Sequence, residues 1–128
     1  MKASQATEAA TRTEKAAVLT KAVLRAAEIL QIRQNELAEI LGVSAPTVTR
    51  LAGGDKKVLD GRAEYQLAVL FVRLFRSLDT LVGGNAEQAR LWLRAHNDHL
   101  NGVPIELAKT IRGLVNVADY LDAVRGAP

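Results

Sequence analysis

The spacing of the apolar residues constrains the fold of this chain most strongly, because it follows the helical period. Between Glu14 and Leu30 the apolar side chains recur every three to four residues, as they do on one face of an amphipathic helix. No stretch of any length alternates apolar and polar residues as a half-buried strand does. The sequence therefore predicts an all-α fold.

Glycine and proline positions divide the rest of the chain into further helices. We expect helices over residues 35–41, 44–52, 62–82 and 86–95, a loop over 96–103, and a last helix that begins with Pro104. Residues 1–13 lack apolar periodicity and are predicted to be frayed or disordered. Aromatic residues make up only 4% of the chain, so Leu, Val, Ile and Ala must form the core.

Several classes of protein are disfavoured by composition. The chain has no cysteine, which excludes a disulfide framework, a cysteine nucleophile and a zinc site built on cysteine. The longest apolar run, Leu67–Val72, is far shorter than the about 20 residues of a membrane span. The N-terminal residues lack the apolar core of a secretory signal. We therefore expect a cytoplasmic protein without membrane contact.

The most informative stretch runs from Gln34 to Leu51 and fits a helix-turn-helix. Ala38 is small, as a close crossing by the next helix requires, and Gly42 suits a turn with positive φ. Ser44 is a good N-cap, and Pro46 falls in the first helical turn, where a missing N–H costs nothing. The alternative is a helical hairpin without a role in DNA binding, but the joint pattern favours the DNA-binding motif.

The residues left exposed by this motif are small or form hydrogen bonds, as a helix that enters the major groove requires. Arg50 is placed to bond a guanine or to contact a phosphate, and Gln34 to hold the DNA backbone. The net charge of +3 is too small to indicate binding by bulk charge alone. Lys56 and Lys57 contact the flanking backbone or simply belong to a solvated loop. The predicted DNA-binding residues are Gln34, Ser44, Ala45, Pro46, Thr47, Thr49, Arg50, Lys56 and Lys57.

The second half carries a less common succession of residues. It includes Arg73–Asp79, Gly83-Gly84-Asn85, Ala89–Leu93, Asn97, Leu100–Pro104, Gly113-Leu114-Val115, Val117 and Tyr120-Leu121. With these residues the chain resembles the antitoxins of the Xre/MbcA/ParS family over residues 14–126. Asn101 departs from the pattern, because a glycine is expected before Gly102; we expect the turn to tolerate it.

The resemblance implies a function with two parts. It implies a helix-turn-helix domain over residues 14–61 and a domain for toxin binding and dimerisation over 62–128. It implies that the chain represses its own operon and neutralises a cognate RES-domain toxin, an enzyme that consumes NAD, by blocking its active site with the C-terminal end. The toxin-binding residues so implied are Asp119, Asp122, Arg125, Gly126, Ala127 and Pro128.

Other interpretations remain open at this point. The apolar stripe of Phe71, Leu74, Phe75 and Leu78 indicates core packing first and a homodimer contact second. A stand-alone dimeric repressor without a toxin partner is the main alternative. A small enzyme or metal protein built around His96 and His99 is a weaker one, because that stretch offers no further ligand. We predict no catalytic residue, metal site or cofactor.

Overall fold

A computed structural model describes residues 3–54, 59 and 61–126. The described residues form helices and no strand, which confirms the predicted all-α class. The helices are α1 (Ala3–Leu30), α2 (Gln34–Leu41), α3 (Ala45–Gly53), α4 (Arg62–Leu81), α5 (Ala86–Arg94), α6 (Pro104–Leu107) and α7 (Ile111–Arg125). No helix among the described residues is long and apolar enough to cross a membrane.

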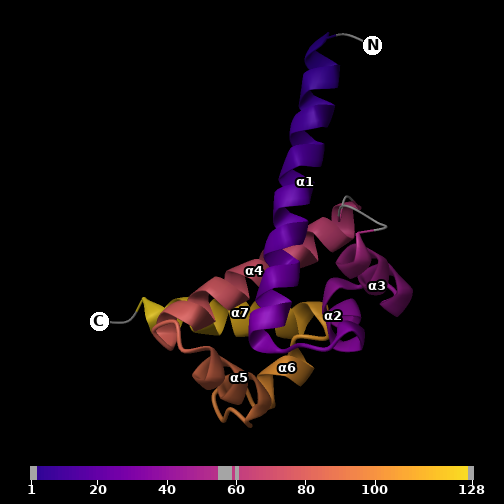
Figure 1. Cartoon of the computed structure of the whole chain (residues 1–128). Coiled ribbons are helices and arrows are strands. Elements are labelled where there is room, and N and C mark those ends of the chain that lie inside the picture. The colour runs from indigo at the N-terminus through magenta and orange to yellow at the C-terminus, as the bar shows by residue number, and fades with distance from the viewer. Residues whose placement is uncertain (1–2, 55–58, 60, 127–128) are drawn as a thin grey trace.

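Helix α1 is longer than the sequence predicts. It begins at Ala3 and not at Glu14, so the residues expected to be frayed continue the helix instead. Its N-terminal half extends away from the rest of the molecule, while its C-terminal half lies against α4 (Figure 1). Alanine, which favours helix most, is the commonest residue of this extension, and its preference takes the place of the apolar face that periodicity detects.

The helices share a single apolar core. The buried residues of the helix-turn-helix, of α4 and of α5 to α7 form one continuous cluster. Phe71, Leu74 and Leu78 are buried within this cluster, and Phe75 packs against it partly exposed. The structure therefore corrects the suggested dimer contact: Phe71, Leu74 and Leu78 face the core of their own chain and offer no surface to a second copy.

Helix α7 lies along α4, and the short helix α6 precedes it (Figure 1). The sequence predicts one helix from Pro104, but the structure interrupts it between Leu107 and Ile111. Thr110 caps α7 by accepting a hydrogen bond from the Gly113 N–H at 3.0 Å. A Cβ on Gly113 would lie 1.7 Å from the Leu107 carbonyl oxygen. The close approach of these two backbones explains why a glycine is needed here.

The loop between α5 and α6 contains one isolated antiparallel bridge, between Asn97 and Gly102. Asn101 precedes the bridge residue with a φ of 58°, in the left-handed region. Asparagine adopts this conformation more readily than other non-glycine residues. The family resemblance leads us to expect a glycine at position 101. The turn tolerates Asn101 instead, as predicted.

Candidate nucleic-acid interface and C-terminal surface

Helices α2 and α3 form the predicted helix-turn-helix. Gly42 ends α2 with a φ of 69°, which confirms the expected positive φ at the turn. Ser44 caps α3, because its hydroxyl accepts a hydrogen bond from the Thr47 N–H at 3.2 Å. Val48 and Leu51 are buried and hold α3 against the core. The order of helix, turn and second helix follows from these local residues.

The opposite face of α3 is open to solvent. Ala45, Pro46, Thr49 and Arg50 are exposed, and Thr47 is half-buried. The Thr49 hydroxyl donates a hydrogen bond to the Gln34 side chain at 3.0 Å, which brings the start of α2 beside the middle of α3. Arg50 reaches back to Thr47 at 3.4 Å, so its guanidinium lies over the exposed face. Small side chains around one guanidinium make a helix face that fits the major groove.

The structure brings together most of the predicted DNA-binding residues. Gln34, Ser44, Ala45, Pro46, Thr47, Thr49 and Arg50 share one surface formed by α2 and α3. Lys56 and Lys57 lie outside the described residues.

The C-terminal residues have a different environment from the one predicted. Asp119 and Asp122, expected to face a partner, bind Arg73 of α4: the distances are 2.5 Å from the guanidinium Nη2 to Asp119 and 2.6 Å from Nε to Asp122. The Ser77 hydroxyl also donates to Asp122. This hydrogen bond and the Arg73 charge lower the pKa of Asp122. Both carboxylates therefore hold α7 against α4, although more than half of the Asp119 side chain remains exposed.

The last turn of α7 is open to solvent. Arg125 and Gly126 are exposed, and Ala127 and Pro128 lie outside the described residues. The C-terminal end of α7 and helix α3 lie at opposite ends of the molecule (Figure 1).

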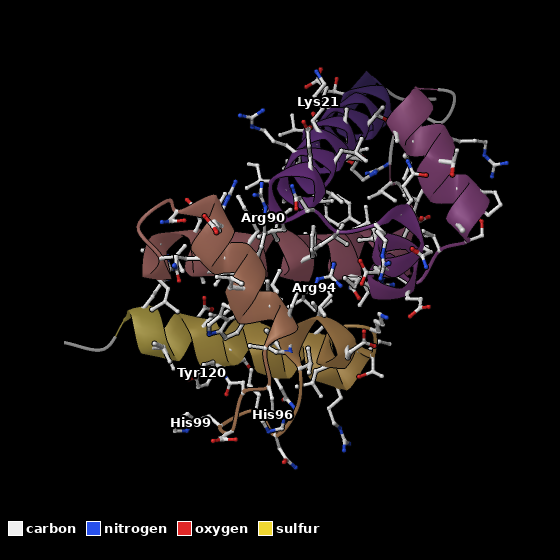
Figure 2. The ribbon with its side chains drawn as sticks, turned by 60° about the horizontal axis from the view of Figure 1, so that its bottom comes forward. Lys21, Arg90, Arg94, His96, His99 and Tyr120 are labelled. Carbon is white, nitrogen blue, oxygen red and sulfur yellow. The ribbon has the colours of Figure 1, made fainter. Side chains whose placement is uncertain are left out.

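Three rings stack on the surface formed by α5, α7 and the bridged loop. The Tyr120 ring lies between Trp92, with ring centres 6.4 Å apart, and His99, with centres 5.9 Å apart. Trp92 is only partly buried, so it packs at the edge of the core. His96 and His99 lie at the lower edge of the molecule near Tyr120, far from Lys21 on α1 (Figure 2). Sequence reasoning missed this stack, because its three residues come from separate elements.

His96 has an exposed carboxylate as its charged neighbour, Asp98, at 3.3 Å. Within the described part of the chain, no group of three or more His, Asp or Glu side chains is placed to hold a metal ion. The geometry thus gives no support to the alternative of a metal protein built around these histidines.

An ion pair with a buried carboxylate joins the helix-turn-helix to the second half. Glu36 of α2 is 3% exposed and accepts two hydrogen bonds from the Arg94 guanidinium of α5, at 2.6 and 2.8 Å. The hydrogen bond from Arg94 is the largest cause of a Glu36 pKa of about 2. Arg90 of α5 donates to the Ile29 carbonyl at 2.9 Å and strengthens the same junction (Figure 2). Residues this far apart in sequence give no local signal, so this pair could not be predicted.

Two family models match the chain. Residues 9–73 match the antitoxin Xre-like helix-turn-helix domain, and residues 77–126 match the antitoxin Xre/MbcA/ParS C-terminal toxin-binding domain. No curated protein matches the chain. The first range ends and the second begins within α4. The exposed face of α3 therefore lies in the helix-turn-helix match, and the end of α7 lies in the toxin-binding match. The chain belongs to the Xre family of antitoxins, whose members combine a helix-turn-helix with a toxin-binding domain.

Proposed function

We propose that this antitoxin represses its own operon as a homodimer and neutralises a NAD-consuming RES-domain toxin by covering the toxin's active site with its C-terminal segment. The observation that carries the proposal is the placement of two open surfaces at opposite ends of one core: α3 at one end and the C-terminal end of α7 at the other (Figure 1). No catalytic group of this chain is needed for either part.

The proposed DNA complex places α3 in the major groove. The burial of Val48 and Leu51 supports this arrangement, because it orients Thr47, Thr49 and Arg50 outward. The Arg50 guanidinium carries two parallel donors, which match the O6 and N7 acceptors of guanine. A homodimer then reads two half-sites about one helical turn apart, as such motifs commonly do.

Replacing Arg50 by alanine tests this part of the proposal. We expect operator binding to weaken by about 1–3 kcal/mol if Arg50 reads a base, with much less effect on random DNA. Fluorescence anisotropy with the promoter fragment and a scrambled fragment measures both affinities. Arg112→Ala, which removes an exposed arginine from α7, is the matched control. Equal losses on both fragments indicate a phosphate contact, and unchanged affinity contradicts the placement of α3.

The proposed toxin complex involves the end of α7 and the residues after it. The match to a toxin-binding domain supports a toxin partner, and the exposure of Arg125 and Gly126 supports their availability. A short terminal segment can fill a deep pocket, and a guanidinium pairs well with the carboxylates or other acceptors of a nucleotide site. The identity of the toxin as a RES-domain enzyme follows from the resemblance of the second half.

Removal of residues 124–128 tests this part. We expect the shortened chain to lose neutralisation, so that cells expressing the RES toxin stop growing and their NAD falls, while operator binding is unchanged. Arg50→Ala is the reciprocal control, which should lose repression and keep neutralisation. Continued protection by the shortened chain excludes the C-terminal segment as the blocking element. A chain that never binds a RES protein favours the stand-alone repressor.

A further inference from the structure

The N-terminal half of α1 lacks cover within the described chain. Ala16 is the first buried residue of this helix, and the described side chains before it, those of Thr7, Glu8 and residues 11–15, are exposed. The extension points away from the remaining helices (Figure 1). A helical segment of this length is only marginally stable without tertiary contacts. The projecting half of α1 therefore becomes more stable if another surface packs against it.

A groove lies beside this extension, between α1 and α4. It has a volume of about 800 Å³, and its apolar lining includes Val18, Leu19 and Ala22 from α1 and Val69 and Val72 from α4. Val18 is 69% exposed and Val69 is 43% exposed. Val18 belongs to the apolar stripe that the sequence assigns to the buried face of α1. We call this surface the α1–α4 groove.

We infer that the α1–α4 groove is the homodimer interface, in which the projecting half of α1 from a second copy lies. The inference rests on the homodimer included in the proposed function and assigns its surface. The uncovered helix and the unfilled groove adjoin each other on one chain. A two-fold axis that places each extension in the partner's groove therefore covers both features at once.

The dimensions of the two features agree. The extension Ala3–Lys15 is about 20 Å long, and the groove follows α4 from Tyr65 to Ser77 over about 18 Å. A helix of about 10 Å diameter buries about 300 Å² of its side, and each copy contributes both a helix and a groove. The resulting area of about 600 Å² per partner is at the lower end of the range for stable dimers, which centres near 800 Å².

The rim of the groove is mostly basic and can accept a carboxylate of the occupant. Exposed Arg76 lines the groove, and exposed Arg62 lines the hollow that adjoins it at the start of α4. Neither guanidinium has an ion-pair partner among the described residues. The projecting half of α1 carries two exposed carboxylates, Glu8 and Glu14, and two exposed cations, Arg12 and Lys15, so its charges cancel overall. In the two-fold arrangement Glu8 of one copy approaches the basic rim of the other.

The test measures the mass of the full chain in solution by light scattering after size-exclusion chromatography. We expect the unmodified chain to be a dimer and Val18→Glu to raise the dimer Kd at least about tenfold, because the carboxylate must enter the apolar groove. Ile111→Glu is the matched control, because Ile111 is 68% exposed and lies on α7 away from the groove. We expect this control to remain a dimer.

A second measurement uses the absence of cysteine from the chain. Thr11→Cys, on the groove wall near the middle of the overlapping α1 helices, and Ile111→Cys each introduce a single thiol, and a short bifunctional thiol reagent should cross-link the first variant and not the second. A monomeric unmodified chain, a dimer that Ile111→Glu breaks but Val18→Glu does not, or a groove that binds only the toxin would overturn the inference. Operator binding and toxin binding of Val18→Glu are measured separately from its mass. These two measurements show whether the proposed function holds even if the inferred interface is wrong.

Discussion

Glu36 is a buried carboxylate whose charge is balanced by a residue from the other half of the chain. Arg94 and the Arg33 N–H surround it with hydrogen bonds, at 2.6–2.8 and 3.0 Å. These contacts lower its pKa from an ordinary 4.5 to about 2. Because the folded-state pKa is the lower one, the stabilisation is fully present above about pH 4.5 and disappears as the pH falls toward 2.

This dependence predicts the behaviour of Glu36→Gln. At pH 7 we expect the free energy of unfolding to fall by about 2 kcal/mol, less than the pKa shift alone implies, because the Arg94 side chain is 38% exposed and water screens the attraction. The difference in free energy of unfolding between the unmodified chain and Glu36→Gln should shrink steadily as the pH falls from 4.5 to 2. Urea unfolding followed by circular dichroism measures it.

Glu39→Gln provides the control for this series, because Glu39 lies on the same helix but is largely exposed, 3.6 Å from Lys109. We expect it to cost less than about 0.5 kcal/mol. A Glu36→Gln deficit that stays constant with pH would show that the carboxylate charge does not stabilise the junction.

Gly113 permits the close approach of α7 to the end of α6. We predict that Gly113→Ala destabilises the protein by more than about 2 kcal/mol, since the new Cβ would overlap the Leu107 carbonyl oxygen. Gly53→Ala, also in a helix, has no atom within 4 Å of the added Cβ, and we expect it to be neutral or stabilising by up to about 1 kcal/mol. Thermal unfolding of both variants compares them. Equal stabilities would contradict the proposed contact.

Most helices could be predicted because each carries its own local signals. Apolar spacing identified the helices that begin near residues 62 and 86. Gly42 marked the end of α2, and Ser44 marked the start of α3. The start of α1 and the break before α7 were not predicted. The first depends on helix propensity without an apolar face, and the second depends on a backbone contact between Leu107 and Gly113.

Helix α1 also holds Leu59, which lies between α3 and α4 in the sequence. Buried Thr20 accepts a hydrogen bond from the Leu59 N–H at 2.8 Å and donates one to the Ala16 carbonyl. Thr20→Val leaves the Leu59 N–H buried and unpaired, so we expect a loss of about 1–3 kcal/mol. Thr11→Val, at an exposed position of the same helix, should cost much less. Guanidinium unfolding compares the two variants, and similar midpoints would refute the assigned role of Thr20.

At the scale of the whole molecule, the two halves share a core but present their open surfaces at opposite ends (Figure 1). The helix-turn-helix surface was predictable because its residues lie within one short stretch. The C-terminal surface was less so: Asp119 and Asp122 bind Arg73 and Ser77, partners that no pattern within α7 reveals. Likewise, the sequence favoured core packing for the stripe of Phe71, Leu74 and Leu78, but it left a dimer contact open, because the packing of α7 against α4 is not readable from the pattern.

The central claim is that one chain binds operator DNA and toxin at separate ends. The most direct test is the native mass of the material captured when the tagged chain is co-expressed with a RES-domain toxin, the proposed partner, and mixed with the promoter fragment. Our account predicts one assembly that contains the antitoxin, the RES protein and the DNA together. A DNA-bound antitoxin that leaves the RES protein behind in the unbound fraction would contradict it.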